Sequence, residues 1–264
     1  MKQVAPLRYD VIFKKAFSHP ELFTALVEDF IGIPLEIDQV ENDKAFSPSV
    51  GKVAIKFDLF AQDTKNRVIV EMQHAHYSDT FERFLYYQCV AMAETIASSK
   101  TYKFPVTVFT LVFFTGKKRP HPDSGILIHD FDPRDFVTGE IIKNVYARKH
   151  RLIFVFTNDT PHPDTPKKCV EWMQAIDDSL DGEIDEDDYT NPHIKRLFEL
   201  IELEQITPEE YARMKDDYNQ EESEKQAFEE GKKETARNLK ALGALTEEQI
   251  ASVTGLTLEE IKAL

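Results

Sequence analysis

Apolar and polar residues alternate most regularly between residues 55 and 73 of the chain. Ile55, Phe57 and Leu59 form one alternating run, and a second alternating run ends at Gln73. A period of two is typical of half-buried β-strands. The four residues between the runs, Asp-Thr-Lys-Asn, favour a tight turn because Asp and Asn side chains bond to nearby backbone groups. This stretch therefore predicts a β-hairpin.

Patterns elsewhere predict an α/β fold in which a crossover helix packs on a mixed sheet. We expect a first domain at 1–168 and an acidic, mostly helical C-terminal region at 169–264. Helical periodicity predicts helices at 9–31 (interrupted at Pro20), 78–99, 191–204 and 208–230, and apolar runs predict strands at 104–114, 126–129 and 147–157. The segment 35–50 is expected to be extended and loop-like. The segment 177–188 is expected to be a mobile, solvated loop because eight of its twelve residues are acidic.

The last part of the chain predicts two short helices that resemble a helix-turn-helix unit. Thr246 and Thr257 are suitable N-caps, and Gly255 separates the two helices. The second helix offers acidic residues where a recognition helix would need Arg, Lys or Asn. This composition favours a packing or assembly module over a DNA reader.

The register of the hairpin decides whether two acidic side chains meet. If the turn is centred on Thr64 and Lys65, the numbers of paired residues sum to 129, so that Asp58 faces Glu71. Facing side chains share one side of a sheet, with Cβ atoms about 4.5–5.5 Å apart. Bare carboxylates repel there, whereas a cation such as Mg²⁺ would join them. The alternative is a surface hairpin with two solvated acids, which spacing alone favours.

Four further groups of residues allow both a structural and a functional interpretation. Asp10 begins a helix, where a carboxylate complements the macrodipole, but it is also a possible extra acid of the site. Arg83 either makes a surface ion pair or contacts a backbone phosphate or the carboxylates. The basic run Lys117, Lys118 and Arg119 is a solvated turn or a phosphate contact. The histidines at 74 and 76 fit exposed strand-end residues or phosphate contacts better than a zinc site.

The net negative charge of the chain comes from one segment. The net charge is −15, which at first opposes binding to nucleic acid. Residues 1–170 carry 22 basic and 21 acidic side chains (22 − 21 = +1), whereas 171–230 carry 5 and 21 (5 − 21 = −16) and 231–264 carry 5 and 5. Local basic clusters of the neutral first region can therefore still contact phosphates.

Other features of the composition indicate a globular protein. No apolar run approaches the roughly 20 residues of a membrane span, and the first residues have no signal-peptide character. Two distant cysteines provide no disulfide framework. We therefore expect a cytoplasmic protein that does not bind membranes.

The ordered set of motifs resembles the PD-(D/E)XK nuclease superfamily and, within it, the recombination-promoting nuclease/putative transposase family. The resemblance covers residues 9 to about 160 and the C-terminal tail. It is carried by YDVIFKKAF near the start, Asp58, the Glu-Met-Gln of residues 71–73, the helix with Arg83, Tyr86 and Tyr87, and the segment GKKETARNLKALGALTEEQIASVTGLTLEEI.

This resemblance implies an α/β core, with a central mixed sheet flanked by helices, and Mg²⁺-dependent hydrolysis of DNA phosphodiesters, with Mn²⁺ as a substitute metal. Asp58 and Glu71 would be the metal ligands, with Asp10 as an additional acid. Gln73 stands where the superfamily signature has lysine, and an amide cannot supply positive charge. Lys56, which faces Gln73 in the predicted register, is a candidate for the missing cation.

Two alternatives to an active endonuclease remain at this point. One is a catalytically degenerate family member that binds DNA or a protein as an assembly factor. The other is a purely structural interaction protein with a solvated hairpin. Cutting both strands of DNA with one site per chain would require a homodimer, for which the C-terminal helices are the candidate interface.

Overall fold

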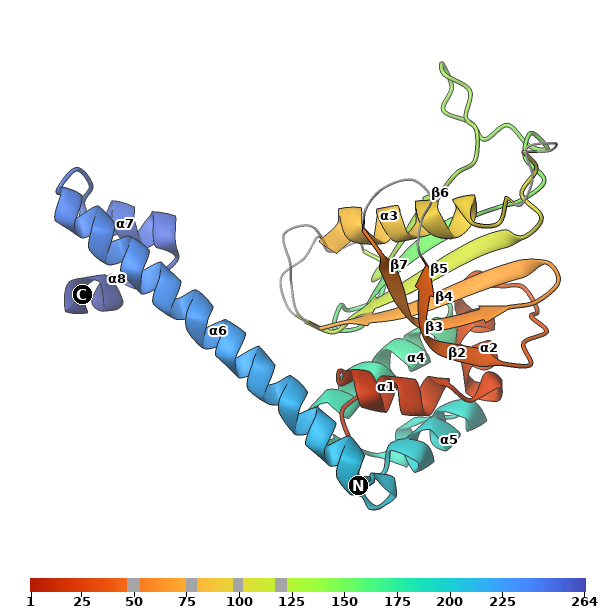
Figure 1. The fold of residues 1–264 in the computed structure, drawn as a ribbon, viewed down its shortest axis with the longest axis horizontal. Coiled ribbons are helices and arrows are strands. Elements are labelled where there is room, and N and C mark those ends of the chain that lie inside the picture. The colour runs from red at the N-terminus through yellow and green to blue at the C-terminus, as the bar shows by residue number, and fades with distance from the viewer. Residues whose placement is uncertain (47–52, 75–79, 97–101, 117–122) are drawn as a thin grey trace. The chain divides into compact units, whose positions relative to one another are not determined.

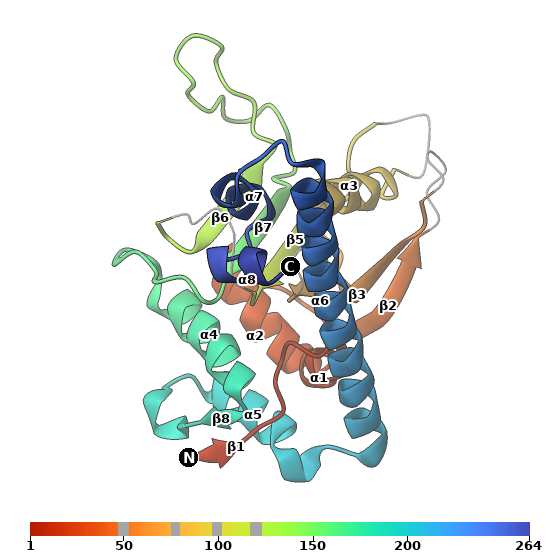
Figure 2. The same ribbon diagram turned by 90° about the vertical axis from the view of Figure 1, so that its left-hand side faces the viewer.

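The computed structural model describes residues 1–46, 53–74, 80–96, 102–116 and 123–264, which divide into two compact units, Met1–Glu210 and Tyr211–Leu264. The first unit is built on a six-stranded mixed sheet with the order β2-β3-β4-β5-β7-β6 (Figures 1 and 2). Its strands are β2 (Val40–Phe46), β3 (Ile55–Gln62), β4 (Asn66–Gln73), β5 (Thr107–Phe114), β6 (Ile126–Asp130) and β7 (Arg151–Phe156). The three central strands, β4, β5 and β7, are parallel, and the other pairings are antiparallel.

Helices cover both faces of this sheet. The helix α3 (Thr80–Ala93) joins the parallel strands β4 and β5 and packs on one face, as a crossover helix must. The other face carries α1 (Asp10–Phe17), α2 (Pro20–Ile31), α4 (Lys167–Asp178) and α5 (Pro192–Ile201), as Figure 1 shows. The α/β fold with a mixed sheet flanked by helices, predicted from the sequence, is confirmed.

Aromatic packing on the two faces fixes the central strands. All eight residues of β5 are buried, as expected for a strand that is covered on both sides. On the α3 face, Phe84 packs with Phe114 and Phe154 of the neighbouring parallel strands. On the opposite face, the Phe30 ring of α2 meets Phe113 edge to face, 5.3 Å between centroids. The end of the sheet at which β4 stops is therefore packed against helices on both faces.

Two segments expected to be loops are ordered structure. The polar sequence of 40–46 forms the edge strand β2, which lacks the alternation of a half-buried strand because its residues are mostly exposed or half-exposed. The acidic segment 177–188 is not a mobile loop. It contains two 3₁₀ turns, Ser179–Asp181 and Glu186–Asp188, and the strand β8 (Glu183–Ile184), which pairs with β1 (Lys2–Gln3).

The division between the units falls at Glu210/Tyr211, later in the chain than the expected boundary at 168/169. Residues after 168 remain with the sheet because α5 packs against α1 and α2, and α4 packs against α2. Trp172 of α4 is fully buried, and its indole N–H donates to the Asp29 carboxylate at 2.9 Å. The first part of the acidic region is therefore integral to the α/β unit.

The second unit is helical. The long helix α6 (Pro208–Leu242) runs into it, followed by α7 (Glu247–Thr254) and α8 (Leu258–Ala263). Thr246 and Thr257 form capping boxes at the starts of α7 and α8, and Gly255 ends α7 in the left-handed conformation, as predicted. Ala236, Ile250, Leu256 and Ile261 form a small core. Among the described residues, none of the helices combines the length and apolar character needed to cross a membrane.

Candidate metal centre

The β3–β4 hairpin has the predicted register, and its ladder ends beside two acidic residues. Leu59 pairs with Val70, and the pairing continues regularly to Gln62 with Arg67. These pairs keep the expected sum of 129. Beyond Leu59 and Val70 the backbone ladder stops, so that Asp58 and Glu71 are the next residues on the two strands. The register prediction is confirmed over the paired residues.

The two acidic side chains replace the backbone ladder at this point. The backbone N–H of Asp58 donates to Oε1 of Glu71 at 3.1 Å, and the N–H of Met72 donates to Oδ2 of Asp58 at 3.1 Å. Each carboxylate thus accepts a hydrogen bond from the partner strand. These reciprocal contacts hold the two groups at the open end of the hairpin and fix their orientation.

The pairing of β3 with β2 is irregular at Asp58. Phe57 and Phe60 both contact the ring of Phe46, and both belong to the apolar cluster beneath α3, although strict alternation would put them on opposite faces. The ladder between β2 and β3 also skips the pairing of Asp43 with Asp58, and Asp43 has a left-handed φ of 55°. The backbone pairing of β2 with β3 is therefore interrupted beside Asp58.

Burial makes the two carboxylates hold protons unusually tightly. Burial and the nearby charge of Asp10 raise the pKa of Asp58 to about 6, against the opposing hydrogen bond from Met72. Burial and the charge of Asp58 raise the pKa of Glu71 well above its usual range, and the positive charge of Arg83 opposes this increase. Glu71 is only 6% exposed. A nearby cation would favour the ionised form of both groups.

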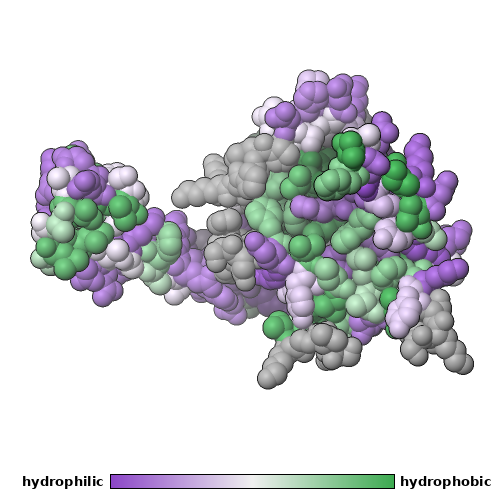
Figure 3. All heavy atoms as spheres, turned by 90° about the horizontal axis from the view of Figure 1, so that it is seen from above, coloured by the Kyte–Doolittle hydropathy of each residue, from purple (hydrophilic) through white to green (hydrophobic). Residues whose placement is uncertain are grey.

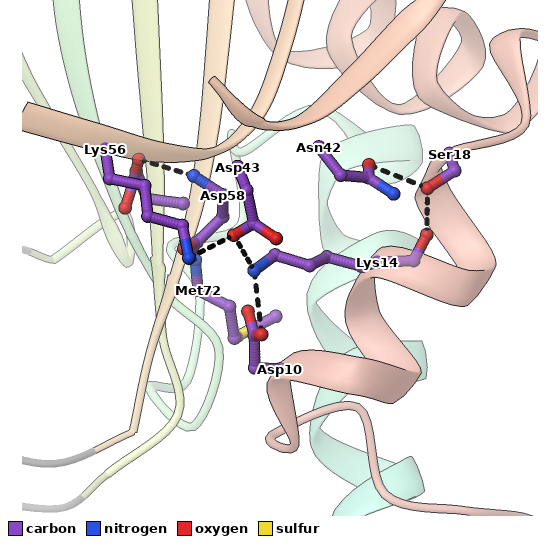
Figure 4. A network of polar contacts seen from close by, with 9 residues as sticks. Asp10, Lys14, Ser18, Asn42, Asp43, Lys56, Asp58 and Met72 are labelled. Atoms are coloured by element: carbon purple, nitrogen blue, oxygen red, sulfur yellow. Dashed lines mark hydrogen bonds and ion pairs between the residues drawn. The ribbon is translucent and has the colours of Figure 1, made fainter. Parts of the chain in front are cut away.

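A chain of ion pairs leads from Asp10 past Asp58 to the edge strand (Figure 4). Lys14 of α1 lies 2.7 Å from Asp10 and 2.6 Å from Asp43, and Lys56 lies 2.9 Å from the same Asp43 carboxylate. Sequence reasoning did not find Lys14 or Asp43, because α1 and β2 are brought together only by the tertiary fold. The helical spacing from Asp10 to Lys14 was the available signal.

Arg83 occupies the position beside Gln73. Its guanidinium donates to the side-chain carbonyl of Gln73, and its charge acts on Glu71. Lys56, which was expected to face Gln73, has its ammonium group at Asp43 instead and is largely exposed. Of the two cationic residues considered for this end of the hairpin, Arg83 is the one that contacts the glutamine.

The remaining candidate residues divide into described and undescribed positions. Nδ1 of His74 lies 2.7 Å from Oγ1 of Thr115, and Nε2 lies 3.2 Å from Nη1 of Arg8, so this ring links β5 to the segment before α1. Lys117, Lys118 and Arg119 lie outside the described residues, as does His76. Arg8 was not among the residues singled out from the sequence.

The donor set fits a hard divalent cation. Within the described ranges, no group of three or more His, Cys, Asp or Glu side chains is placed to hold a metal, so the protein offers the pair Asp58 and Glu71. Mg²⁺ typically uses one or two carboxylates and completes its shell with waters and substrate phosphates. The two adjacent carboxylates have raised pKa values even though Lys14 and Arg83 act on them, so a divalent cation would further favour their ionised forms.

The mixed six-stranded sheet flanked by helices has the architecture expected of a PD-(D/E)XK-like α/β core. The chain belongs to the PD-(D/E)XK nuclease family transposases, whose family model matches residues 7–231. A search among curated proteins found no match. The family and fold predicted from the sequence are therefore confirmed, and a nuclease- or transposase-related role follows from family membership.

Proposed function

We propose that this protein is a metal-dependent DNA endonuclease that hydrolyses phosphodiester bonds and is related to recombination-promoting nucleases. The observation that carries the proposal is the meeting of Asp58 and Glu71 at the open end of the hairpin, each bonded to the backbone of the other strand. Family membership independently supports DNA as the substrate.

In the proposed mechanism, Asp58 and Glu71 would hold a divalent metal, with Mg²⁺ as the natural ion and Mn²⁺ as a substitute. When bound, such an ion would lower the pKa of a water molecule and neutralise charge on the scissile phosphate. The hydrogen bonds from Asp58 N–H and Met72 N–H keep the two carboxylates oriented before the substrate arrives. Lys14 holds Asp10 near Asp58, where Asp10 would add a further negative group to the site.

We further propose that Arg83 supplies the positive charge that Gln73 lacks. Gln73 accepts a hydrogen bond from Arg83 and so keeps the guanidinium at the end of β4. A guanidinium is permanently charged and suited to phosphate oxygens, although it cannot act as a general base. Lys56 remains the second candidate for this charge, and Lys117, Lys118 and Arg119 remain proposed contacts to the DNA backbone.

The proposal is tested by nicking of supercoiled plasmid DNA with Mg²⁺, with Mn²⁺ or with excess EDTA. We expect nicking with either metal and none with EDTA, and we expect Asp58→Ala and Glu71→Ala each to abolish it. Calorimetry should show one metal-binding event that both substitutions remove. Metal binding without nicking would favour the alternative of a degenerate DNA- or protein-binding assembly factor. Absence of both would favour a structural interaction protein.

The assembly state enters the proposal because one site cuts one strand at a time. A homodimer formed through the C-terminal helices would present two sites to a duplex. Light scattering on the full chain, alone and with DNA, measures the mass directly. A monomer in both states would restrict the proposal to single-strand nicking.

A further inference from the structure

A cavity of about 860 Å³ lies at the end of the sheet opposite the carboxylate pair. Its walls come from the segments before the parallel strands β5 and β7, and from Met92 near the end of α3. Glu71 and Gln73 lie instead toward the other ends of these parallel strands, where Gln73 pairs with Phe114. The cavity is therefore separate from the candidate metal centre, and none of the roles proposed above uses it.

Aromatic side chains line this cavity. Phe104 and Phe131 approach it from the segments that flank the sheet, and Tyr102 and Tyr146 stand at its rim with exposed fractions of 79% and 57%. Figure 1 shows the loop between β6 and β7, which contains Tyr146, projecting beyond the sheet. Figure 3, which views the molecule from above, shows hydrophobic residues among hydrophilic ones on the surface. Exposed aromatic rings are the usual platforms for stacking nucleobases.

Cationic groups accompany these rings. Lys103, Arg148 and Lys149 line the cavity, and its described lining contains no Asp or Glu, although the ammonium group of Lys149 pairs with Asp132 outside the lining. Arg148 is held in place because its guanidinium donates to the backbone carbonyls of Phe104 and Pro105. Its charge therefore stays at the cavity without a carboxylate to neutralise it there. This combination fits an anionic ligand with an aromatic part.

His150 provides a buried donor that has no partner in the part of the chain that the structure describes. It lines the cavity, is only 4% exposed, and accepts a hydrogen bond at Nδ1 from the N–H of Val108 at 3.0 Å. The neutral ring must then carry its proton on Nε2. Nε2 is buried and has no hydrogen-bond partner among the described residues. Burial, helped by the charge of Arg148, lowers the pKa of His150, which keeps the ring neutral.

An unsatisfied buried donor is costly, so a ligand that offers an acceptor would gain from binding here. Nucleobases offer carbonyl and ring-nitrogen acceptors beside a stacking face, and their phosphates match the lining cations. We propose that this cavity binds one unpaired nucleotide, with its base between the rim tyrosines and near His150 and its phosphate near Arg148. The nucleotide belongs either to a single strand or to a free monophosphate, because the recognised chemistry is the same.

The position of the cavity gives this site a function in the proposed nuclease. Glu71 lies five residues along β4 from Asn66, which is at the cavity end of the sheet. At about 3.3 Å per residue this is roughly 17 Å, or about five base pairs of B-DNA. A strand held here would be cut at a fixed distance from its unpaired nucleotide. This deepens the proposed function and depends on it for the cutting step, although not for the binding itself.

Binding can be measured without catalysis, by fluorescence anisotropy in EDTA with the full chain and a labelled oligothymidylate. We expect saturable binding that the double variant Tyr102→Ala/Tyr146→Ala weakens about tenfold or more, because stacking contributes strongly per base. Tyr218→Ala, which removes a comparably exposed tyrosine from α6, is the matched control and should bind like wild type. Competition with thymidine monophosphate distinguishes the two sources: displacement at concentrations similar to those at which the oligothymidylate binds indicates a free nucleotide, and displacement only at much higher concentrations indicates a strand.

A second variant tests the buried donor. His150→Asn keeps an acceptor for the N–H of Val108 but removes the ring Nε2–H, so we expect weaker binding with an unchanged melting temperature. Equal binding by wild type and the tyrosine double variant would overturn the proposal, as would the absence of binding by wild type. Lost nicking with normal oligothymidylate binding would contradict only the endonuclease. Normal nicking with binding insensitive to the tyrosines would contradict only this site.

Discussion

The two ends of the β3–β4 hairpin both place a buried or half-buried carboxylate against backbone N–H groups, with opposite results. In the turn, Asp63 accepts bonds from Lys65 N–H and Asn66 N–H at 2.6 Å each and from the Asn66 amide at 3.1 Å. These donors outweigh burial and lower the pKa of Asp63. At the open end, Asp58 has a single backbone donor and an acidic neighbour, and its pKa rises to about 6.

The two carboxylates therefore differ in the form that the fold favours. Asp63 stabilises the fold in its ionised form, whereas Asp58 would need a cation to favour its ionised form. Asp63 has enough local donors to remain ionised, so its negative charge contributes to the stability of the turn. Asp58 and Glu71 have one backbone donor each and repel one another, so the folded protein is stabilised by a proton or a metal there. The same substitution at both ends, Asp to Asn, should therefore affect different properties.

The largest expected effect is on cleavage. Asp58→Asn and Glu71→Gln should reduce metal-dependent nicking by about a thousandfold or more, since the lost metal supplies several kcal/mol of transition-state stabilisation. Asp63→Asn is the matched control at the other end of the hairpin and should nick at nearly the wild-type rate. Equal losses in all three variants would mean that hairpin stability, rather than metal binding, limits the activity.

The next effect concerns stability in the absence of metal. The folded-state pKa of Asp58, about 6, exceeds its ordinary value of 3.8, so the stabilisation by its proton is complete below that ordinary value and is lost as the pH rises through about 6. A shift of about two units corresponds to roughly 3 kcal/mol. In EDTA near neutral pH, Asp58→Asn should therefore unfold at higher urea than wild type.

The matched variant Asp63→Asn should behave in the opposite way. The pKa of Asp63 is lowered, so its ionised form stabilises the fold above its ordinary pKa and this contribution is lost on acidification. Its replacement should lower stability near neutral pH. Adding Mg²⁺ should stabilise wild type and this variant but not Asp58→Asn. Urea denaturation monitored by fluorescence, with and without Mg²⁺, measures the change in unfolding free energy for both variants.

A smaller effect is expected at Arg83. Arg83→Gln should lower nicking by about a hundredfold, the lower end of the range for one lost electrostatic contact in a desolvated site. Gln73→Lys added to Arg83→Gln should restore part of the rate, because lysine would place a charge at the same end of β4. No rescue, together with an unchanged rate in Arg83→Gln alone, would remove Arg83 from the mechanism.

The smallest effect is expected at Lys56. Its ammonium group pairs with Asp43 and its side chain is 65% exposed, so Lys56→Ala should change nicking only a few-fold, as expected for an exposed ion pair. The effect of Lys56→Ala is measured as its nicking rate at saturating metal, compared with wild type. An unchanged rate would end the proposal that Lys56 supplies the charge missing at Gln73, and a loss as large as that of Arg83→Gln would reverse their order.

Local patterns predicted much of the fold, because they reflect local physics. The hairpin register followed from its alternation and from the turn at Asp63, and the capped tail helices followed from Thr246 and Thr257. The edge strand β2 was missed because VENDKAF has no apolar face. The order of the acidic segment was missed because it depends on a distant strand, β1, and on the hydrogen bond of Tyr189 to Asp178.

The candidate site was predicted in part for the same reason. Asp58 and Glu71 are related by a local register, which the sequence specifies. The contact of Arg83 with Gln73 depends on how α3 is placed over the sheet, and the charge chain from Lys14 to Asp43 joins a helix to an edge strand. The interruption of β3 at Asp58 accompanies the packing of Phe57 and Phe60 around Phe46. A strict alternation of faces along the strand cannot predict this packing.

The completely buried strand β5 has a consequence for handling the protein. Its sequence, TVFTLVFF, is uncharged and rich in β-branched and aromatic residues, which makes it prone to aggregation whenever the sheet is open. Pro105 precedes it and Lys117, Lys118 and Arg119 follow it, the arrangement of gatekeepers that protect such segments during synthesis. Neutralising the three basic residues to test DNA contact would also remove this protection, so soluble yield must be measured beside cleavage.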